Sequence, residues 1–323
     1  MKVCVTGGNG FIGSRVVKEL VRENYDVRLV LRKTSKTQRI SDLKFEKVYG
    51  DILDKESLHK AFQGCDAVIH LACISSWDQI RSGKMEEVAV QGSQNVFEAA
   101  LHNKIKKLIH VSSAAAVNAN STQNKISNEE TKFTLQNSTL IYAKAKHKVE
   151  KIALEYLKKG LPIVICNPSE VYGENDDDFV TSGNLRDFIQ DWPTLVPHGG
   201  TGVVYVGDVA KGIVQALQKG RPGERYILSS ENLSIKELAE LALEAAGKKR
   251  KVITLPNGLL MGLVSTLEKI KVKPPIPKDV LEYAVRYWFV DNAKAKKELG
   301  FNPISAKEAI KKTVSWLRDS HYI

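Results

Sequence analysis

The sequence predicts a doubly wound α/β fold, a parallel sheet covered by helices on both faces, with a smaller mixed cap toward the C-terminus. Short β-branched runs, such as residues 27–31 and 162–166, alternate with amphipathic stretches over the first half of the chain. Strands separated by helices form parallel βαβ units with right-handed crossovers. We expect strands near 2–6, 26–31, 44–49, 66–71, 106–112 and 162–167, and helices near 11–23, 55–62, 84–103 and 139–159.

The regular alternation fades after Pro168, which divides the chain into two expected domains. Residues 1–167 form the sheet domain, completed by about 206–230 through a helix near 207–219 and a strand near 224–229. Residues 168–205 and 231–323 form the cap, where four prolines between positions 256 and 277 predict short helices. The apolar segment 259–267 is too short to cross a bilayer, which takes about 20 residues. We expect it to pack over a substrate site or a partner subunit.

Composition is ordinary for a soluble globular protein. The 323 residues are 43% hydrophobic and carry a net charge of +11, with lysine groups at 248–251, 269–273 and 294–297. These lysines are interleaved with acids and lack an aromatic stacking motif, so we expect a solvated surface and neither nucleic acid nor membrane as partner. The N-terminus enters a strand at once, which predicts no signal peptide. Four scattered cysteines without metal-ligand spacing predict reduced thiols, a cytoplasmic location and no metal.

The first thirteen residues carry the strongest local signal. An apolar strand at 2–6 runs into glycines at 7, 10 and 13, and an amphipathic helix follows. The glycines permit a positive φ, a close backbone approach to a pyrophosphate and tight packing of helix on strand. The N-terminus of the helix then presents free N–H groups and the positive end of its dipole to the phosphates. This arrangement predicts a dinucleotide-binding Rossmann domain.

A second signal lies in the predicted helix at 139–159, where Tyr142 and Lys146 stand four residues apart and share one face. A nearby ammonium favours the phenolate, so we expect Lys146 to lower the pKa of Tyr142. A phenol tuned in this way donates and accepts protons near neutrality. Ser112 and Ser113 end the preceding strand, the edge at which ligands bind in parallel sheets, and a serine there can donate to a carbonyl oxygen.

Together these segments resemble the extended short-chain dehydrogenase/reductase family, also called the NAD-dependent epimerase/dehydratase family. The matching segments are residues 6–13 (T-G-G-N-G-F-I-G), 50–54 (G-D-I-L-D), 70–73 (H-L-A-C), 167–173 (N-P-S-E-V-Y-G), 205–210 (Y-V-G-D-V-A) and 291–303. The resemblance implies that Tyr142 is the general acid/base, that Lys146 tunes it and holds the nicotinamide ribose, and that Ser113, rather than Ser112, orients the carbonyl.

The resemblance also implies a set of cofactor contacts. They fall at Gly7, Gly10, Phe11, Ile12, Gly13, Arg32, Lys33, Asp51, Ile52, Leu71, Ala72, Cys73, Tyr142, Lys146, Asn167, Pro168 and Val171. One position departs from the family pattern, since Ala89 stands where N-V-x-G-T-x-N has its first asparagine. The polar stretch 118–138 reads as a long loop, either a flap that touches the substrate or a flexible surface loop.

The residues after the second strand favour NADP(H) over NAD(H). An NAD-binding protein places an acid there, to accept from the ribose 2′-hydroxyl. This chain has Arg32 and Lys33, with Arg39 further on, and a guanidinium binds a 2′-phosphate through paired charge-assisted hydrogen bonds. The alternative is a solvated basic loop with no cofactor role.

For the substrate, the sequence favours a small carbonyl compound over a nucleotide sugar. A sugar diphosphate needs cap cations, yet residues 172–205 contain one arginine, Arg186, no lysine, and an acidic run at 174–178. We therefore expect an NADP(H)-dependent reductase similar to the dihydroflavonol-reductase branch. Arg250 and Arg286 are cations further along the cap, and they leave a nucleotide-sugar substrate as an alternative. The alternatives are a nucleotide-sugar epimerase or dehydratase with tightly bound NAD, and a non-catalytic NADP-binding protein. The resemblance also allows a homodimer.

Overall fold

A computed structural model describes residues 1–74, 76–274 and 276–323, and it contains a seven-stranded, fully parallel sheet. The spatial order of the strands is β10-β6-β5-β4-β1-β2-β3. Their bounds are β1 (Lys2–Thr6), β2 (Asp26–Leu31), β3 (Glu46–Tyr49), β4 (Ala67–His70), β5 (Lys107–Val111), β6 (Ile163–Pro168) and β10 (Arg225–Leu228). The predicted fold class is confirmed, and most expected strand limits lie within two residues of those observed.

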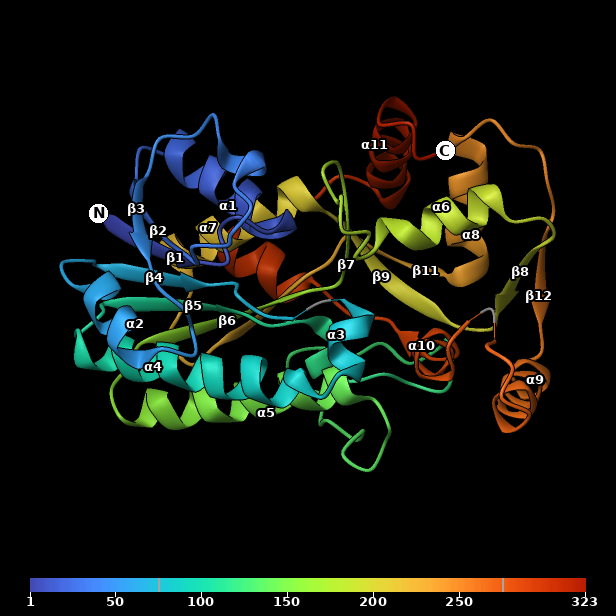
Figure 1. The fold of residues 1–323 in the computed structure, drawn as a ribbon, viewed down its shortest axis with the longest axis horizontal. Coiled ribbons are helices and arrows are strands. Elements are labelled where there is room, and N and C mark those ends of the chain that lie inside the picture. The colour runs from blue at the N-terminus through green and yellow to red at the C-terminus, as the bar shows by residue number, and fades with distance from the viewer. Residues whose placement is uncertain (75, 275) are drawn as a thin grey trace.

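Helices cover both faces of this sheet, as Figure 1 shows. On one face lie α1 (Phe11–Arg22) and α7 (Val206–Lys219), and on the other lie α2 (Lys55–Phe62), α4 (Gly92–His102) and α5 (Ile141–Lys158). The core is divided accordingly. Val3, Val5 and Leu29 pack toward α1 and α7, whereas Cys4, Val68 and Leu108 pack toward the opposite layer. Both faces of the strands are therefore buried, which explains their nearly continuous apolar sequences.

The smaller, mixed part of the molecule lies beyond the carboxyl ends of the large sheet. Its strands are β7 (Glu170–Tyr172), β9 (Gly200–Tyr205), β11 (Glu231–Ser234) and β13 (Tyr287–Trp288), which form one sheet, and β8 (Thr194–Pro197) and β12 (Val252–Leu255), which form another. Its helices are α6 (Ser182–Gln190), α8 (Ile235–Ala245), α9 (Asn257–Lys269), α10 (Lys278–Ala284) and α11 (Ala306–Asp319). Pro256 and Pro277 directly precede α9 and α10, so the prolines do delimit short helices, while Pro275 lies outside the described residues.

Two segments differ from the expectation or refine it. The expected helix 84–103 begins as a π-helical turn, Glu86–Gln91, before α4. Ala89, which stands where the family pattern has an asparagine, is buried there among apolar side chains. Residues 118–140 form no regular element, but bridges from Asn120 to Tyr287 and from Ser127 to Val290 tie them to the cap. The segment is therefore anchored against the cap by backbone pairing and is not a free surface loop.

The boundary between the two expected domains stays a prediction, and part of the expected cap packs on the large sheet. Ala295, Leu299 and Phe301 belong to the same buried cluster as α1 and α7. Helix α9 contains the segment 259–267, whose packing over a substrate site or a partner subunit stays a prediction. Of its thirteen residues Val264 is the one that is buried.

Candidate active site

The glycine-rich loop lies at the switch point of the sheet, where the strand order reverses between β1 and β4. Gly7 has φ +75°, and a Cβ there would stand 2.6 Å from the backbone nitrogen of Ala72, at the end of β4. A Cβ on Gly13 would stand 2.0 Å from the carbonyl oxygen of Gly7. These two positions therefore tolerate only glycine, and the loop stays close to the strand ends.

The first turn of α1 is open to an anion. Gly10 caps the helix without a side chain, and the first turn, which begins at Phe11 and Ile12, contains no acid. Its N–H groups have no intrahelical acceptor, and the helix dipole adds partial positive charge at this end. A cradle that a Cβ would fill, together with free N–H groups, fits the pyrophosphate of a dinucleotide. The expected contacts at Gly7, Gly10, Phe11, Ile12 and Gly13 are thus brought together in one loop.

The ends of β2 and β3 carry the residues expected around the adenosine half. Arg32 and Lys33 are exposed just after β2, in a turn closed by the Ser35 hydroxyl, which accepts from the Arg32 backbone N–H at 3.0 Å. Asp51 follows β3 and is half-buried, with one carboxylate oxygen held by the Leu53 N–H at 3.0 Å. Ile52 packs so closely on α4 that a Cβ on Gly92 would stand 2.6 Å from its terminal carbon.

Arg39, by contrast, is occupied elsewhere. Its guanidinium pairs with Asp177 at 3.1 Å and Asp178 at 3.0 Å, and it donates to the carbonyl of Asn175. Glu174 accepts from Tyr205 and pairs with an α1 arginine at 3.2 Å. The acidic run 174–178 therefore serves contacts within the chain. Because their partners are the chain's own groups, these acids do not by themselves argue against a sugar diphosphate.

Asp176, in the same run, is fully buried and caps the start of α6. Its carboxylate accepts from the backbone N–H groups of Val180, Thr181 and Ser182 at 2.9–3.0 Å.

Tyr142 and Lys146 do share one face of α5, directed toward the carboxyl ends of β4 and β5. The Lys146 ammonium lies 5.8 Å from the centre of the Tyr142 ring and donates to the carbonyl of Val111 at 3.4 Å. Cys73, just past β4, is the further neighbour that both side chains have in common. Lys146 is buried and Tyr142 half-buried, so the ammonium is screened little by water.

The pKa of Tyr142 is raised, which corrects the expectation that it would be lowered. Burial of the phenol disfavours its anion and outweighs the ammonium of Lys146, which acts in the lowering direction together with Ser113. Burial likewise disfavours the charged form of Lys146, but neighbouring Cys73, Tyr142 and Glu150 more than offset this and raise its pKa. Tyr142 is accordingly a protonated phenol beside a charged lysine at neutral pH.

The two serines after β5 have different surroundings. Ser112 is buried and donates to the Glu150 carboxylate at 2.5 Å, so its hydroxyl is engaged in the interior. Ser113 is half-buried, and its hydroxyl accepts from the N–H of Ala115 at 3.2 Å, which leaves its own proton free to donate. The geometry thus favours Ser113 as the serine that meets a ligand, as the sequence predicts.

Glu150, which sequence reasoning missed, is the centre of a buried network behind these serines. It lies one turn beyond Lys146 on the same face of α5 and is 1% exposed. Asn167 donates to Glu150 at 2.6 Å and to the Ser113 carbonyl at 2.8 Å, while Arg225 of β10 pairs with the second carboxylate oxygen at 2.8 Å. Burial raises the pKa of Glu150, and Arg225 opposes that shift. The spacing of 142, 146 and 150 on one helix is the signal that could have revealed it.

A chain of hydrogen-bonded, uncharged side chains lies beside the glycine-rich loop. His70 Nδ1 bonds the Thr6 hydroxyl at 2.7 Å, and His70 Nε2 bonds the Ser93 hydroxyl at 3.0 Å. Burial, with Lys146 nearby, lowers the pKa of His70 to about 3. His110 packs against His70 and Phe97, and neither of its ring nitrogens has a hydrogen-bond partner among the described residues. Both histidines are therefore neutral at pH 7.

The remaining expected cofactor residues line the ends of the central strands. Leu71, Ala72 and Cys73 are half-buried after β4, and the N–H of Leu71 donates to the carbonyl of Thr6 at 3.0 Å. Asn167 and Pro168 end β6, and Val171 is buried in β7. The structure thus brings most of the sequence-predicted site residues to one edge of the sheet; Arg32 and Lys33 extend from it at the adjacent end of β2.

An aromatic cluster (Trp77, Tyr283 and Trp288), which no sequence motif predicts, packs beside the Tyr142 helix. The Tyr283 hydroxyl accepts from the N–H of Ala143 at 3.2 Å, and the ring stacks on Trp288 at 5.4 Å and meets Trp77 edge-on at 5.0 Å. The rings of Tyr283 and Trp288 both pack on the buried cluster that includes Ala143, the residue after Tyr142. The cap thus brings apolar ring surface beside the candidate proton donor.

The described residues contain no group of three or more His, Cys, Asp or Glu side chains arranged to hold a metal ion. No helix within the described ranges is long and apolar enough to cross a membrane.

Comparisons with known proteins agree with this geometry. A family model described as NAD dependent epimerase/dehydratase family matches residues 3–229. A putative dihydroflavonol 4-reductase of Synechocystis sp. is 29% identical over 330 residues, which cover 99% of this chain and 95% of that protein. Cinnamoyl-CoA reductase 1 of Oryza sativa subsp. japonica is 31% identical over 259 residues, 75% of each chain. The crystal structure of gox2253 superposes with a TM-score of 0.87 at 29% identity and covers 98% of both chains.

One family accounts for both the glycine loop at the switch point and the arrangement of Ser113, Tyr142 and Lys146. The region that its model matches includes all of them. The chain belongs to the NAD-dependent epimerase/dehydratase family, the extended short-chain dehydrogenase/reductases, whose members are enzymes.

Proposed function

We propose that this protein is an NADP(H)-dependent reductase that interconverts a carbonyl and a hydroxyl group on a small apolar or aromatic substrate. The observation that carries the proposal is the aromatic cluster, in which the Tyr283 hydroxyl bonds the N–H of Ala143, the residue after Tyr142. It supplies apolar ring faces directly next to the candidate proton donor, and the polar atoms of Tyr283 and Trp288 are already bonded to the chain. A substrate held there is recognised by apolar and stacking contact rather than by charge.

In this proposal the glycine loop and the start of α1 hold the pyrophosphate, Asp51 lies toward the adenine, and Lys146 lies toward the nicotinamide ribose. The bound nicotinamide supplies the hydride that reaches the substrate carbonyl carbon, or receives it in the reverse direction. The chain's own residues provide the proton chemistry. Ser113 donates to the carbonyl oxygen as negative charge develops there, and Tyr142 transfers its phenolic proton to that oxygen.

The raised pKa of Tyr142 supports the reductive direction. A general acid must carry its proton when the reaction begins, and burial keeps this phenol protonated through the neutral range. After transfer, the Lys146 ammonium stabilises the phenolate that remains. Glu150, bonded through Asn167 to the backbone of Ser113, acts as a positioning residue.

The preference for NADP(H) rests on Arg32 and Lys33. Both are exposed after β2, no carboxylate occupies the position that would accept from a ribose 2′-hydroxyl, and neither side chain has an ion-pair partner among the described residues. A free guanidinium beside the adenosine end matches a 2′-phosphate in charge and geometry. NAD(H) is the alternative cofactor.

A nucleotide-sugar epimerase or dehydratase is the second candidate, and Arg286 favours it. The Nε atom of Arg286 is buried and has no hydrogen-bond partner in the described part of the chain. Arg186 and Arg250 of the cap are already engaged within the chain. Arg186 pairs with Asp187 and covers the Phe179 ring, and Arg250 donates to backbone carbonyls at the end of α6. One arginine is a weak match for the charge of a diphosphate.

The proposal is tested by NADPH oxidation with a panel of aromatic and aliphatic ketones and aldehydes. Tyr142→Phe keeps the ring but removes the proton, so we expect kcat for any active substrate to fall by about 10²- to 10⁴-fold while NADPH binding is retained. The matched control is Tyr49→Phe, on a tyrosine that is 53% exposed on β3. If Tyr142→Phe and wild type reduce the substrate equally well, the proposed role of Tyr142 is wrong, and a non-catalytic nucleotide-binding protein becomes the better account.

A further inference from the structure

Exposed apolar side chains gather at the cap end of the molecule. Of the 14 large hydrophobic side chains that are exposed among the described residues, 8 lie within the two short segments 192–195 and 253–276. They are Trp192, Leu195, Ile253, Leu259, Leu263, Ile270, Val272 and Ile276, with Trp192 68% and Leu259 62% exposed. We call this set the cap-end surface. Singly exposed apolar residues are ordinary, whereas a concentration of them in two segments at one end of a molecule favours a binding surface.

Three elements bring Leu195, Ile253, Leu259 and Leu263 to one end of the molecule. Strands β8 and β12 pair in parallel with Ile253 opposite Leu195, and these two residues point outward because their neighbours Val252 and Val196 are buried. Helix α9 follows β12 directly, and Leu259 and Leu263 lie four residues apart on its exposed face. Figure 1 shows β8, β12 and α9 together at the end opposite the N-terminus.

Lysines surround this apolar surface. Residues 247–276 contain seven basic side chains and a single acid, Glu268. Lys248 and Arg250 donate to backbone carbonyls of α6. The other five (Lys249, Lys251, Lys269, Lys271 and Lys273) are exposed and form no ion pair with any carboxylate of the described residues. The flanks of the surface therefore carry concentrated positive charge beside leucine, isoleucine and tryptophan.

We propose that the cap-end surface docks on an anionic lipid membrane, with α9 lying in the interfacial plane. Charge complementarity decides the occupant. A helix of 13 residues with leucines on its exposed face and lysines at its C-terminal end has the character of an interfacial helix, held by apolar insertion and by attraction to anionic headgroups. A second copy of the chain would bring the same lysines together, and their repulsion opposes that arrangement.

The docking surface is also linked to the candidate active site. Residues 270–277 lead from α9 to α10, whose Tyr283 contacts the N–H of Ala143 beside Tyr142. Docking would hold the aromatic cluster near a source of apolar substrates. This last point rests on the proposed function, whereas membrane binding itself does not. The sequence predicts a solvated lysine surface without a membrane partner; the exposed leucines and isoleucines beside these lysines are the observation that leads us to propose surface contact instead.

The test is co-sedimentation of the full chain with vesicles of phosphatidylcholine alone and with vesicles that also contain phosphatidylglycerol. We expect binding to the anionic vesicles, little binding to the neutral ones, and loss of binding as salt is raised. The double variant Leu259→Asp, Leu263→Asp should weaken binding by about tenfold or more, because both leucines lose their apolar insertion. Lys269→Glu with Lys271→Glu should weaken it by a similar factor.

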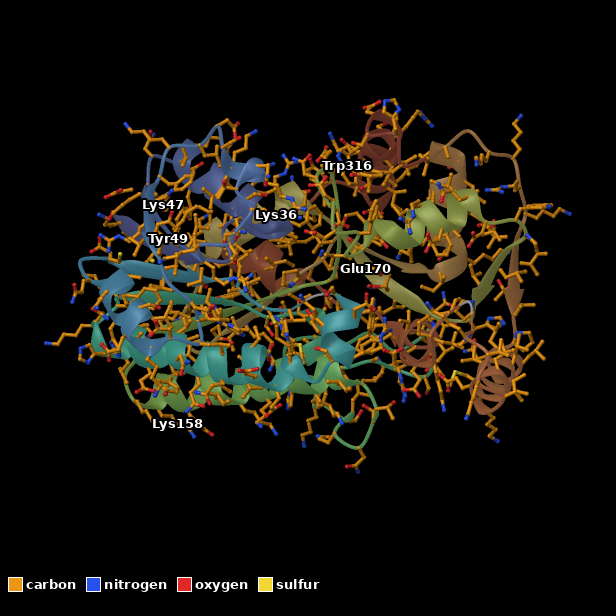
Figure 2. All side chains as sticks on the ribbon, in the orientation of Figure 1. Lys36, Lys47, Tyr49, Lys158, Glu170 and Trp316 are labelled. Carbon is orange, nitrogen blue, oxygen red and sulfur yellow. The ribbon has the colours of Figure 1, made fainter. Side chains whose placement is uncertain are left out.

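Matched controls separate docking from general effects. Ile126→Asp changes an isoleucine that is 58% exposed in the 118–138 segment, and Lys158→Glu reverses an exposed charge at the far end of α5, where Figure 2 labels it. Both should bind anionic vesicles like wild type. The proposal is overturned if wild type does not sediment with anionic vesicles, or if the α9 variants bind as wild type does. Wild-type dimers that the leucine variants convert to monomers, without vesicle binding, would instead identify a subunit interface.

Discussion

At the scale of single residues, the active-site face of α5 contains a buried carboxylate, that of Glu150, which no sequence motif predicts. Glu150 is buried, and its carboxylate bonds Ser112, Asn167 and Arg225. Removing one partner of a buried pair leaves the other charge uncompensated, although Arg225 retains 18% exposure, which lessens the cost. We expect Glu150→Gln to lower the free energy of unfolding by about 1–3 kcal/mol.

Urea unfolding measures this, with Glu98→Gln as the control. Glu98 pairs with Lys55 on the surface, where both side chains are more than 40% exposed, so its loss should cost less than about 1 kcal/mol. A positioning role for Glu150 adds a second expectation, that kcat falls while KM for NADPH stays constant. Equal effects of the two substitutions on stability would contradict the buried network.

Arg32 carries the cofactor prediction. Arg32→Asp replaces a cation by an anion at the end of β2, and we expect NADPH affinity to fall by about 10- to 100-fold, since a charge-assisted contact is lost. NADH affinity should change little, because NADH lacks the 2′-phosphate. Isothermal titration of both nucleotides measures the ratio, and Lys158→Asp serves as a distant charge control. Equal losses for the two nucleotides, or none, would contradict recognition of the 2′-phosphate by Arg32.

Residue-level prediction from the sequence succeeded where local pattern sets the geometry. The spacing of Tyr142 and Lys146 fixes their common helix face, and the preference for Ser113 agrees with the burial of Ser112. Residue-level prediction failed where a side chain forms an ion pair with residues remote in the sequence. Arg39 was a cofactor candidate but binds Asp177 and Asp178, 138 and 139 positions away, and no local rule reports such contacts. The pKa of Tyr142 was misjudged for the same reason, since burial is a tertiary property.

At the scale of elements, two helical glycines have opposite expected effects. Gly13→Ala in α1 places a Cβ 2.0 Å from the Gly7 carbonyl oxygen, so the loop must shift. We expect a loss of about 1–3 kcal/mol in unfolding free energy, with loss of nucleotide binding. Gly262→Ala in α9 meets nothing within 4 Å and should gain about 0.5–1 kcal/mol, because alanine has less chain entropy to lose.

Urea titrations of both variants, with nucleotide binding measured in parallel, decide this pair. If Gly13→Ala retains full stability and binding, the close approach at the switch point is not required.

Elements with a clear hydrophobic periodicity and with turn residues at their ends were predictable from the sequence. The strands of the large sheet and helices α1, α2, α5 and α7 follow from apolar runs, glycines and helix periodicity, within about two residues. The π-helical turn at 86–91 was not, because hydrophobic period does not distinguish it from an α-helix. The cap was described only as mixed, since its strands are short and pair with partners remote in sequence, such as β9 with β13.

At the scale of the whole molecule, buried neutral histidines make stability depend on pH. The pKa of His110 is held well below its usual value by burial, with His70 and Lys146 adding to the effect. An unfolded chain therefore binds a proton at this residue below pH 6.5 that the folded chain does not. The corresponding stability is present at neutral pH and is lost as pH falls toward the lowered pKa.

His110→Phe tests this term, because the ring nitrogens of His110 have no partners among the described residues and the site is lined by Phe97. Between pH 7 and pH 5 we expect wild type to lose about 2 kcal/mol more unfolding free energy than the variant. Parallel urea titrations at the two pH values give the difference. The same loss in both proteins would mean that His110 already carries a proton in the folded state.

The global architecture was the most predictable feature, because alternating strands and helices admit few topologies once right-handed crossovers are imposed. What joins the two halves was not predictable. Residues 295–301 pack on the large sheet, the loop 118–138 bridges to β13, and the 174–178 run is held by arginines of the nucleotide-binding half. These contacts depend on three-dimensional proximity that sequence pattern does not encode.

The central claim, a reductase that exchanges NADP(H) at every turnover, is tested most directly by the nucleotide content of the gently purified protein. Absorbance and mass analysis of the nucleotide released on denaturation, followed by titration of the nucleotide-free protein with NADPH and NADH, measure it. We predict a substoichiometric nucleotide content and tighter binding of NADPH than of NADH. Near-stoichiometric NAD retained through purification would contradict the account, because an enzyme that regenerates its cofactor within each turnover, as an epimerase does, has no need to release it.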